Sequence, residues 1–316
     1  PTVGALLLQL FSWRAIFVVT AIGAAALLIW ALRAMERGEA GQESTGDLFS
    51  ILLSIVGFGA VVYGLQQLLA RAPQRSLAIG LLCLGVVALI LFVRRQQRLA
   101  EPMLNLGTLE NRLYRTGVLL IIITHLSIFG TFIVLPMYLV NVAGLLPFWA
   151  GVVMLPGGFI GALAPSIAGR LYDRLGARTL SMVGFFLLFA ANLLFSLVAG
   201  TTNVVVLVAI YVLLMCGFGI TLTPVQTHSL NQLQPAELTD GTAILNTCML
   251  IASSMGGSLF IALLSGRSAT FAAQGAAGDP FVAGMVFAYR IAAIVAASGL
   301  ALSLFFAAAK GAATKK

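Results

Sequence analysis

Residues 155–178 read LPGGFIGALAPSIAGRLYDRLGAR, an apolar run rich in small residues and proline that ends in a basic segment. A second apolar run begins directly after it, at residue 179. An apolar run of about 20 residues is long enough to cross the roughly 30 Å hydrocarbon core of a bilayer as a helix. The stretch therefore predicts two membrane helices joined by a short basic turn, close enough to pack and still able to move against each other. This arrangement suits a transporter better than a water-soluble protein.

The composition indicates that lipid rather than water surrounds this chain. Of its 316 residues, 60% are hydrophobic and 9% are charged, and the mean hydropathy is +1.05. Ordinary globular domains carry about 25% charged residues, so this chain has too few charges to coat a water-soluble core of its size. Its three cysteines, Cys83, Cys216 and Cys248, lie inside apolar runs without C-x-x-C spacing. That placement indicates packing residues rather than a disulfide or a metal site.

Nine apolar runs are long enough to span a membrane, and none has the pattern of a strand. They cover residues 15–32, 48–70, 77–93, 116–140, 148–168, 179–199, 203–224, 241–264 and 290–309. Residues 1–10 look like the end of a tenth span. The predicted fold class is therefore an all-α membrane bundle. Because the chain begins at Pro1 rather than at methionine, we interpret it as a fragment that lacks an upstream part.

The net charge of +8 lies in short clusters between the apolar runs. This pattern favours orientation in a membrane over the binding of nucleic acid, so no nucleic-acid partner is expected. Thirteen of the eighteen Lys and Arg residues fall on one side when successive connections alternate between the two sides. Such an excess marks the cytoplasmic side. That side would hold residues 33–47, 94–115, 169–178 and 225–240 and the tail from residue 310.

Sequence motifs for enzyme chemistry are absent. The chain has no Walker A sequence, no H-E-x-x-H, no G-x-S-x-G and no glycine-rich dinucleotide fingerprint, so it does not encode ATP hydrolysis or the other reactions that these motifs serve. Most of its 33 glycines lie within the apolar runs, where small residues let membrane helices approach closely.

The basic turn between the two spans of the opening stretch is the strongest motif. Gly169 and Gly176 are predicted to permit a tight reversal, and Asp173 is predicted to pair with a neighbouring arginine or to lie at a helix N-terminus. The alternative is a basic loop that only anchors the topology. The motif residues are Gly169, Arg170, Asp173, Arg174, Gly176 and Arg178.

This turn, G-R-L-x-D-R-x-G-x-R, resembles the cytoplasmic-loop signature of the major facilitator superfamily. Together with Leu155-Pro156-Gly157-Gly158 before it, it is similar to the fourteen-span drug:proton antiporter branch, the EmrB/QacA/LmrB-like multidrug exporters. Residues 1–5 look like the tail of that branch's antiporter motif G-P-x-x-G-G, with Ala5 in place of the last glycine. Residues 223–226, 231–233 and 240–247 resemble the family pattern around the penultimate span.

The resemblance implies a division of the chain. Residues 1–32 would hold the tail of span five and span six, and residues 33–115 would hold cytoplasmic linkers and two extra spans between the halves. Residues 116–309 would form the C-terminal six-helix half, and residues 310–316 a cytoplasmic tail. The chain departs from the family at Met249-Leu250, where relatives carry a polar pair, so the resemblance implies a more apolar substrate pocket there.

The resemblance also implies a mechanism and partners. These are export by alternating access across the cytoplasmic membrane, with hydrophobic or cationic small molecules and protons as the transported species. The proton gradient would supply the energy, and no cofactor or metal is expected. A periplasmic adaptor is an expected partner only if the source bacterium has two membranes.

Small residues are predicted to pack helices at the antiporter motif. The motif residues are Pro1, Gly4, Gly157, Gly158 and Gly161. Gly157 and Gly161 have the small-xxx-small spacing of close helix contacts, and we expect them to pack against the helix that begins at Pro1–Gly4.

Polar residues inside spans are the candidates for lining the transport pathway. His125 is the titratable group nearest to mid-membrane and is either a proton relay or a neutral histidine that is hydrogen-bonded to a neighbouring helix. His228, at a span end, is expected to be solvated. Other polar residues, in stripes or alone, either line a cavity or serve helix packing. The candidates are His125, Thr124, Thr131, Asn192, Gln226 and Asn246.

Acidic and basic side chains are missing from the predicted span interiors, because Arg290 is placed at the outer start of the last span and residues 265–289 form an external loop. The main proton-carrying carboxylate is therefore expected outside this chain. Three functions remain open at this point. The first is a drug exporter, the second is an exporter of an endogenous metabolite, lipid or siderophore on the same fold, and the third is a membrane scaffold or sensor.

Overall fold

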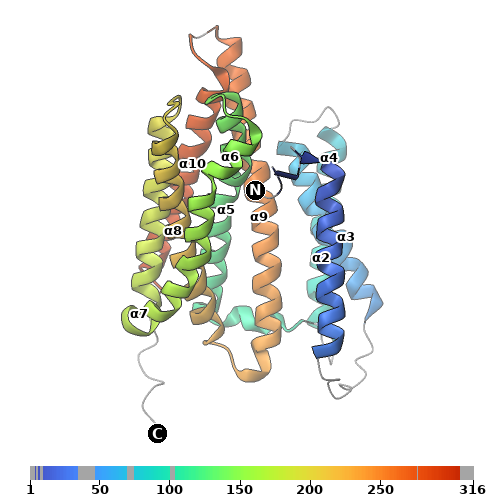
Figure 1. Ribbon diagram of the computed structural model, residues 1–316. Helices are drawn as coiled ribbons and strands as arrows, with labels where there is room; N and C mark the ends of the chain where they lie inside the picture. The colour runs from blue at the N-terminus through green and yellow to red at the C-terminus, as the bar shows by residue number, and fades with distance from the viewer. Residues whose placement is uncertain are drawn as a thin grey trace.

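The computed structural model describes residues 4, 6–7, 10–34, 47–69, 75–99, 104–275 and 277–306 (Figure 1). Within these residues the chain is helical and contains no strand, which confirms the predicted all-α class. The helices are α2 (Trp13–Ala34), α3 (Leu48–Leu69), α4 (Arg75–Gln96), α5 (Arg112–Asn141), α6 (Pro147–Val153), α7 (Leu155–Val198), α8 (Val204–Leu230), α9 (Leu238–Ala273) and α10 (Pro280–Ser303). Two short 3-10 helices, η1 (Leu106–Glu110) and η2 (Pro235–Glu237), precede α5 and α9.

Eight helical segments among the described residues are long and apolar enough to cross a membrane. One of them, Pro147–Val198, has 52 residues and would be about 78 Å long if it were straight, which is far more than one crossing needs. Its backbone is not helical at Gly176, where φ is 75° and ψ is 163°. Two antiparallel crossings therefore meet at Gly176. Counted this way, each of the nine predicted spans has its helix.

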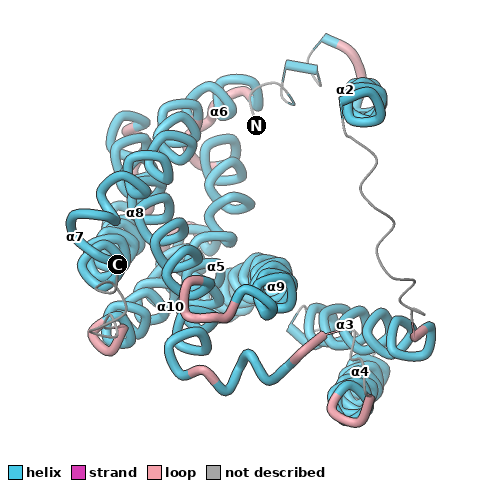
Figure 2. The backbone as a smooth tube through the Cα atoms, turned by 90° about the horizontal axis from the view of Figure 1, so that it is seen from below, coloured by secondary structure: helices cyan, strands magenta, loops and turns pink. Residues whose placement is uncertain are grey.

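The helices fall into three groups (Figures 1 and 2). Helices α5 to α10 pack into one bundle around a continuous apolar core. Helices α3 and α4 pair with each other, and α3 also contacts α9. Helix α2 lies apart, and none of its residues is buried. The connection from α4 to α5, the turn in α7 and the end of α10 all lie at the lower end of the bundle in Figure 1.

Two predicted loops are shorter than expected. The predicted turn at residues 169–178 is helical except at Gly176, because residues 170–175 are mostly good helix formers and Gly169 is accommodated within the helix. The predicted external loop at 265–289 is also largely helical, since α9 continues to Ala273 and α10 already begins at Pro280. Arg290 consequently lies ten residues inside α10, not at its start, and its side chain is exposed.

Close helix contacts in the bundle depend on glycine. A methyl group at Gly217 of α8 would lie 2.9 Å from the backbone of Gly184 and of Leu188 in α7. A methyl group at Gly256 of α9 would lie 3.0 Å from the backbone oxygen of His125 in α5. These distances leave no room for a side chain, so the predicted use of small residues for helix approach is confirmed at these crossings.

Candidate functional site

The basic turn of α7 is exposed at one end of the bundle. Gly176 has φ of 75°, a conformation that only glycine adopts without strain, so its predicted role in the reversal is confirmed. The prediction for Gly169 is wrong, because this residue is helical and makes no turn. The turn's charged side chains are all exposed: Arg170, Asp173, Arg174 and Arg178.

Asp173 makes no ion pair or side-chain hydrogen bond with any residue that the structure describes. The predicted pairing with a neighbouring arginine is therefore wrong for this conformation of the chain. The residue next to it, Tyr172, does make a contact, because its hydroxyl lies 3.2 Å from Nδ1 of His228 in α8. The turn is thus connected to α8 through Tyr172 and not through the carboxylate.

His228 is buried, with only 6% of its surface exposed, so the expectation that it is solvated is wrong. Its ring also packs edge-on against Phe306, at a centroid distance of 4.8 Å, and its Nε2 has no hydrogen-bond partner among the described residues. The sequence shows only a histidine at a span end. It does not show that the His228 ring contacts Tyr172 and Phe306. These residues lie 56 positions before it and 78 after it in the sequence.

His125 lies on α5 and is 2% exposed. Its Nδ1 is 2.8 Å from the carbonyl oxygen of Ile121, one turn earlier in the same helix. The ring stacks on Phe129 of α5 at 5.4 Å and meets Phe218 of α8 edge-on at 5.8 Å. The histidine is therefore bound to its own helix and wedged between aromatic rings, whereas the packing alternative had expected a hydrogen bond to a neighbouring helix.

The hydroxyl groups near His125 are also buried and bond mainly to their own helix. Thr124 donates to the Leu120 carbonyl at 2.8 Å, and Ser127 donates to the Ile123 carbonyl at 2.7 Å. The Thr131 hydroxyl lies beside that of Tyr289 in α10, but neither makes a hydrogen bond of good geometry with the described residues. Membrane helices commonly satisfy Ser and Thr in this way, since the preceding carbonyl is within reach.

The three remaining polar candidates occupy different environments. Asn192 in α7 is fully buried, and it donates to the Leu188 carbonyl at 2.8 Å while its own Oδ1 is unpaired among the described residues. Gln226 of α8 is half-buried, and its amide nitrogen lies 3.8 Å from the sulfur of Met249 in α9. Asn246 of α9 is exposed. The structure therefore does not bring all the predicted pathway residues to one surface.

The glycine motif of α7 packs against α8. A methyl group at Gly157 would collide with the ring of Tyr211, and one at Gly161 would lie 3.3 Å from the sulfur of Met215. Among the described residues, Gly157 and Gly161 thus approach α8. The predicted partner segment Pro1–Gly4 lies mostly outside the described residues, so this part stays a prediction. Gly158 has nothing within 4 Å, and neither has Gly4. Pro1 lies outside the described residues.

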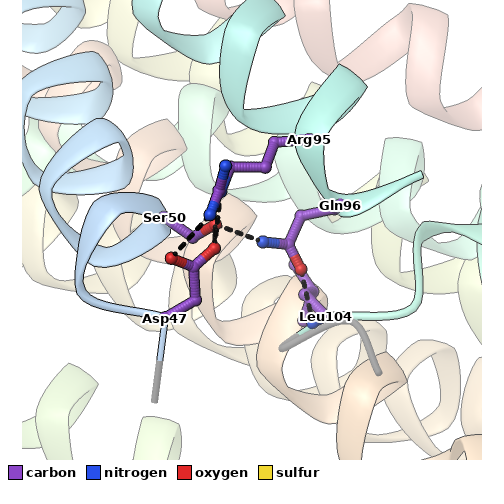
Figure 3. Close-up of polar contacts among 5 residues, drawn as sticks. All are labelled: Asp47, Ser50, Arg95, Gln96 and Leu104. Carbon is purple, nitrogen blue, oxygen red and sulfur yellow. Dashed lines mark hydrogen bonds and ion pairs between the residues drawn. The ribbon is translucent and has the colours of Figure 1, made fainter. Parts of the chain in front are cut away.

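Two polar contacts that the sequence did not reveal lie on the paired helices α3 and α4. Gln66 of α3 donates to the Ser254 hydroxyl of α9 at 2.9 Å and so connects the pair to the bundle. At the other end of α3, Asp47 binds Arg95 of α4 at 2.6 Å (Figure 3). Residues so distant in sequence carry no local signal of such pairing.

The comparisons with known proteins extend over nearly the whole chain. The profile of the Major Facilitator Superfamily matches residues 1–257. The chain is 31% identical to the lincomycin resistance protein LmrB of Listeria monocytogenes over 98% of its own length and 67% of the relative. It is 31% identical to LmrB of Bacillus subtilis over 97% of its own length and 66% of the relative. It is also 28% identical to the multidrug resistance protein Stp of Mycobacterium tuberculosis over 84% of its own length and 50% of the relative.

The chain thus spans about two thirds of the length of the LmrB proteins that it resembles. The profile match, these relatives and the eight membrane-length helical segments agree with the resemblance that the basic turn of α7 first indicated. The chain belongs to the major facilitator superfamily and is a multi-pass membrane transporter rather than an enzyme.

Proposed function

We propose that this transporter exports hydrophobic or cationic small molecules, drugs among them, in exchange for protons. The observation that carries the proposal is the similarity to proteins named for lincomycin resistance over 98% of this chain. Similarity to a protein named for multidrug resistance over 84% of the chain supports the same class of substrate. The chain carries no cofactor in this proposal, and the proton gradient supplies the energy.

The proposed location is the cytoplasmic membrane, with the C-terminus in the cytoplasm. Arg94, Arg95 and Arg98 at the end of α4 and the arginines of the α7 turn belong to connections at one end of the bundle (Figure 1). Arginine-rich short connections are retained on the cytoplasmic side. This end is therefore taken as the inner end.

Residues 116–309 form the C-terminal half of the transporter in this proposal, and α3 and α4 are the two extra spans. Helices α5 to α10 have their own core, which supports their movement as one unit. Alternating access is then a rocking of this unit against the other half about a site near mid-membrane.

The substrate-facing wall is proposed to include α8 and α9 near Gln226, Met249 and Asn246. Asn246 is exposed and Gln226 is half-buried, so both amides are available to a ligand. Met249 contacts Gln226 across the two helices, follows Asn246 by three residues on α9, and has a polarisable apolar side chain. Such a surface suits large apolar ligands that carry few polar groups.

His125 is proposed to take part in proton coupling through its position on α5, where its ring contacts Phe218 of α8. The exchange of His125 for alanine should shift the pH dependence of transport, whereas Ser127→Ala, which removes a neighbouring buried group that does not titrate in this range, should leave it unchanged. The measurement is proton-driven dye transport into inverted vesicles at a series of pH values. An identical pH profile for His125→Ala and the parent would assign His125 to packing alone.

The function itself is tested in a drug-sensitive bacterial host that expresses the complete gene. We expect greater resistance to lincomycin and lower accumulation of a cationic dye, with both effects abolished by a protonophore. Unchanged susceptibility and accumulation would reject the drug exporter. Retention of the effects with protonophore present would reject proton coupling.

A further inference from the structure

Three arginines gather at the inner end of α4. Arg95 donates to both carboxylate oxygens of Asp47, at 2.6 and 3.1 Å (Figure 3). Its guanidinium lies over the Phe49 ring, at 5.1 Å from the ring centroid. Arg94 and Arg98 are exposed and make no ion pair or side-chain hydrogen bond with the residues that the structure describes. Of the three cations in this cluster, Arg95 is neutralised by Asp47, whereas Arg94 and Arg98 have no counter-ion among the described residues.

A groove of about 400 Å³ lies between α3 and α4 at this point. Arg94, Arg95 and Arg98 line its basic side, and Phe49, Leu53 and Leu91 are among the residues that line its apolar side. The salt bridge to Asp47 fixes Arg95 against Phe49 and so shapes the groove. The combination of exposed guanidinium groups with an apolar floor suits a ligand that is anionic at one end and apolar at the other.

A second groove, of about 430 Å³, lies along α4. Val86, Leu89, Ile90 and Val93 line it, and Arg94 and Gln97 lie at its end. Residues 86 to 94 of a helix cover about 12 Å, so this groove leads from the basic end of α4 into the hydrocarbon region. Arg94 borders both grooves and can therefore bind a headgroup whose two chains lie on either side.

We propose that the inner end of the α3–α4 pair binds one phospholipid with an anionic headgroup. Arg94 and Arg98 bind the phosphate, since guanidinium groups match phosphate oxygens in charge and geometry. The two grooves take the acyl chains. Basic pockets between membrane helices near the cytoplasmic leaflet are suited to such lipids. A free phosphate would use the arginines but leave the apolar grooves without a ligand.

The experiment uses the complete protein in mixed micelles of phosphatidylcholine with a minor fraction of phosphatidylglycerol, and native mass spectrometry to measure each retained lipid. The parent protein should retain phosphatidylglycerol in preference to phosphatidylcholine. Arg94→Gln combined with Arg98→Gln should weaken phosphatidylglycerol binding by about 25-fold, since an arginine near an anionic lipid contributes about fivefold. The matched control is Arg75→Gln combined with Arg267→Gln, which removes two exposed charges from the opposite end of the helices and should change nothing.

Three outcomes would overturn the proposal. The first is a parent protein that shows no preference for the anionic lipid, a result that needs no variant and is independent of how the double variant folds. The second is equal lipid retention by the double variant and the control, which would leave the arginines as topology signals only. The third is displacement of the lipid by inorganic phosphate at a similar concentration, which would show a site for a free anion.

Discussion

The bundle of α5 to α10 and the pair of α3 and α4 are held together by different means. Helix α5 buries fifteen of its thirty residues, whereas α4 buries five of its twenty-two. The bundle contains no ion pair among the described residues, whereas the α3–α4 pair is closed by Asp47 and Arg95. The bundle is thus held mainly by the packing of many buried side chains. The α3–α4 pair buries fewer residues and has the Asp47–Arg95 ion pair at its end, which we call the clamp.

The difference follows from the solvent. Apolar side chains gain little by leaving lipid for protein, so helices associate in a membrane through close packing and through polar contacts. The bundle uses the first at Gly184 and Gly217, where the backbones of α7 and α8 meet. The bundle also has hydrogen bonds between helices, such as that from the Tyr114 hydroxyl to the Gly241 carbonyl. The pair differs in adding an ion pair: Gly57, Gly64 and Gly85 bring its backbones together, and hydrogen bonds of Ser50 and Gln96 adjoin the Asp47–Arg95 contact.

The largest loss of stability is expected at Gly217, where α7 and α8 leave no room for a side chain. Gly217→Val would place a branched side chain against the backbone of Gly184 and Leu188, which cannot move away as a flexible side chain can. We expect a loss of stability of about 3 kcal/mol or more and little folded protein. Size-exclusion profiles in detergent measure the folded fraction. Gly158→Val is the control, since nothing lies within 4 Å of that position, and equal profiles for the two variants would contradict the close contact.

A smaller effect is expected at the turn of α7. Gly176→Ala forces a side chain into a backbone conformation with φ of 75° and should cost about 1–3 kcal/mol. Gly169→Ala replaces a helical glycine with a better helix former and should be neutral or slightly stabilising. Thermal unfolding in the same detergent compares the two. The assignment of the reversal to Gly176 alone fails if both variants lose stability to the same degree.

A smaller loss of stability is expected when the contact between the α3–α4 pair and the bundle is removed. Gln66→Ala removes the hydrogen bond to Ser254 that links α3 to α9, and such contacts between membrane helices contribute about 0.6 kcal/mol on average. Hydrogen exchange of α3 should accelerate slightly while that of α5 to α10 stays the same. Gln67→Ala is the control, because Gln67 bonds only to Tyr63 on its own helix. Equal exchange in both variants would mean that the hydrogen bond to Ser254 does not hold the pair to the bundle.

Much of this fold could be predicted from the sequence because the signals were local. Runs of about 20 apolar residues are readable directly, and all nine predicted spans have helices. The reversal after residue 168 could also be predicted, but the sequence offered Gly169 and Gly176 equally, and only Gly176 has the positive φ that the reversal uses. The C-terminal end of α9 and the start of α10 could not be predicted from the apolar runs. Hydropathy marks only the part of a helix that lies in lipid, and these helices continue beyond it.

The contacts between distant residues could not be predicted. Gly157 packs on Tyr211 of α8, a partner that the sequence did not indicate, because a small residue shows that some helix approaches but not which one. The burial of His228 depends on Tyr172 and Phe306, which only the fold brings together. The sequence therefore identified polar residues inside spans more reliably than it identified what each of them touches.

The smallest effect is expected at the clamp itself. Hydrogen bonds from Arg95 and Ser50 hold the pKa of the Asp47 carboxyl well below its ordinary value. A carboxylate with a lowered pKa stabilises the folded state above the pKa of the unfolded chain, and this contribution is lost as the pH falls through the folded value. The contribution of this ion pair to the stability of the fold should therefore be complete at pH 7 and decline below about pH 4, the ordinary pKa of aspartate. Within the folded protein the contact itself persists to a lower pH, where the Asp47 carboxyl is protonated. Exposed ion pairs contribute little, so the change should be modest.

Asp47→Asn tests this expectation by removing the charge at every pH. Spin labels at Leu48 and Val93, both exposed, report the separation of α3 and α4 at the clamp. The variant should show a broader distance distribution than the parent at pH 7, and the two should converge as the parent's carboxyl is protonated. Asp173→Asn, which removes an exposed and unpaired carboxylate, should match the parent throughout. A parent distance distribution as broad as the variant's at pH 7 would mean that the glycine contacts alone hold α3 and α4 together. The pair and the bundle would then both depend on close packing and would differ only in how many residues they bury.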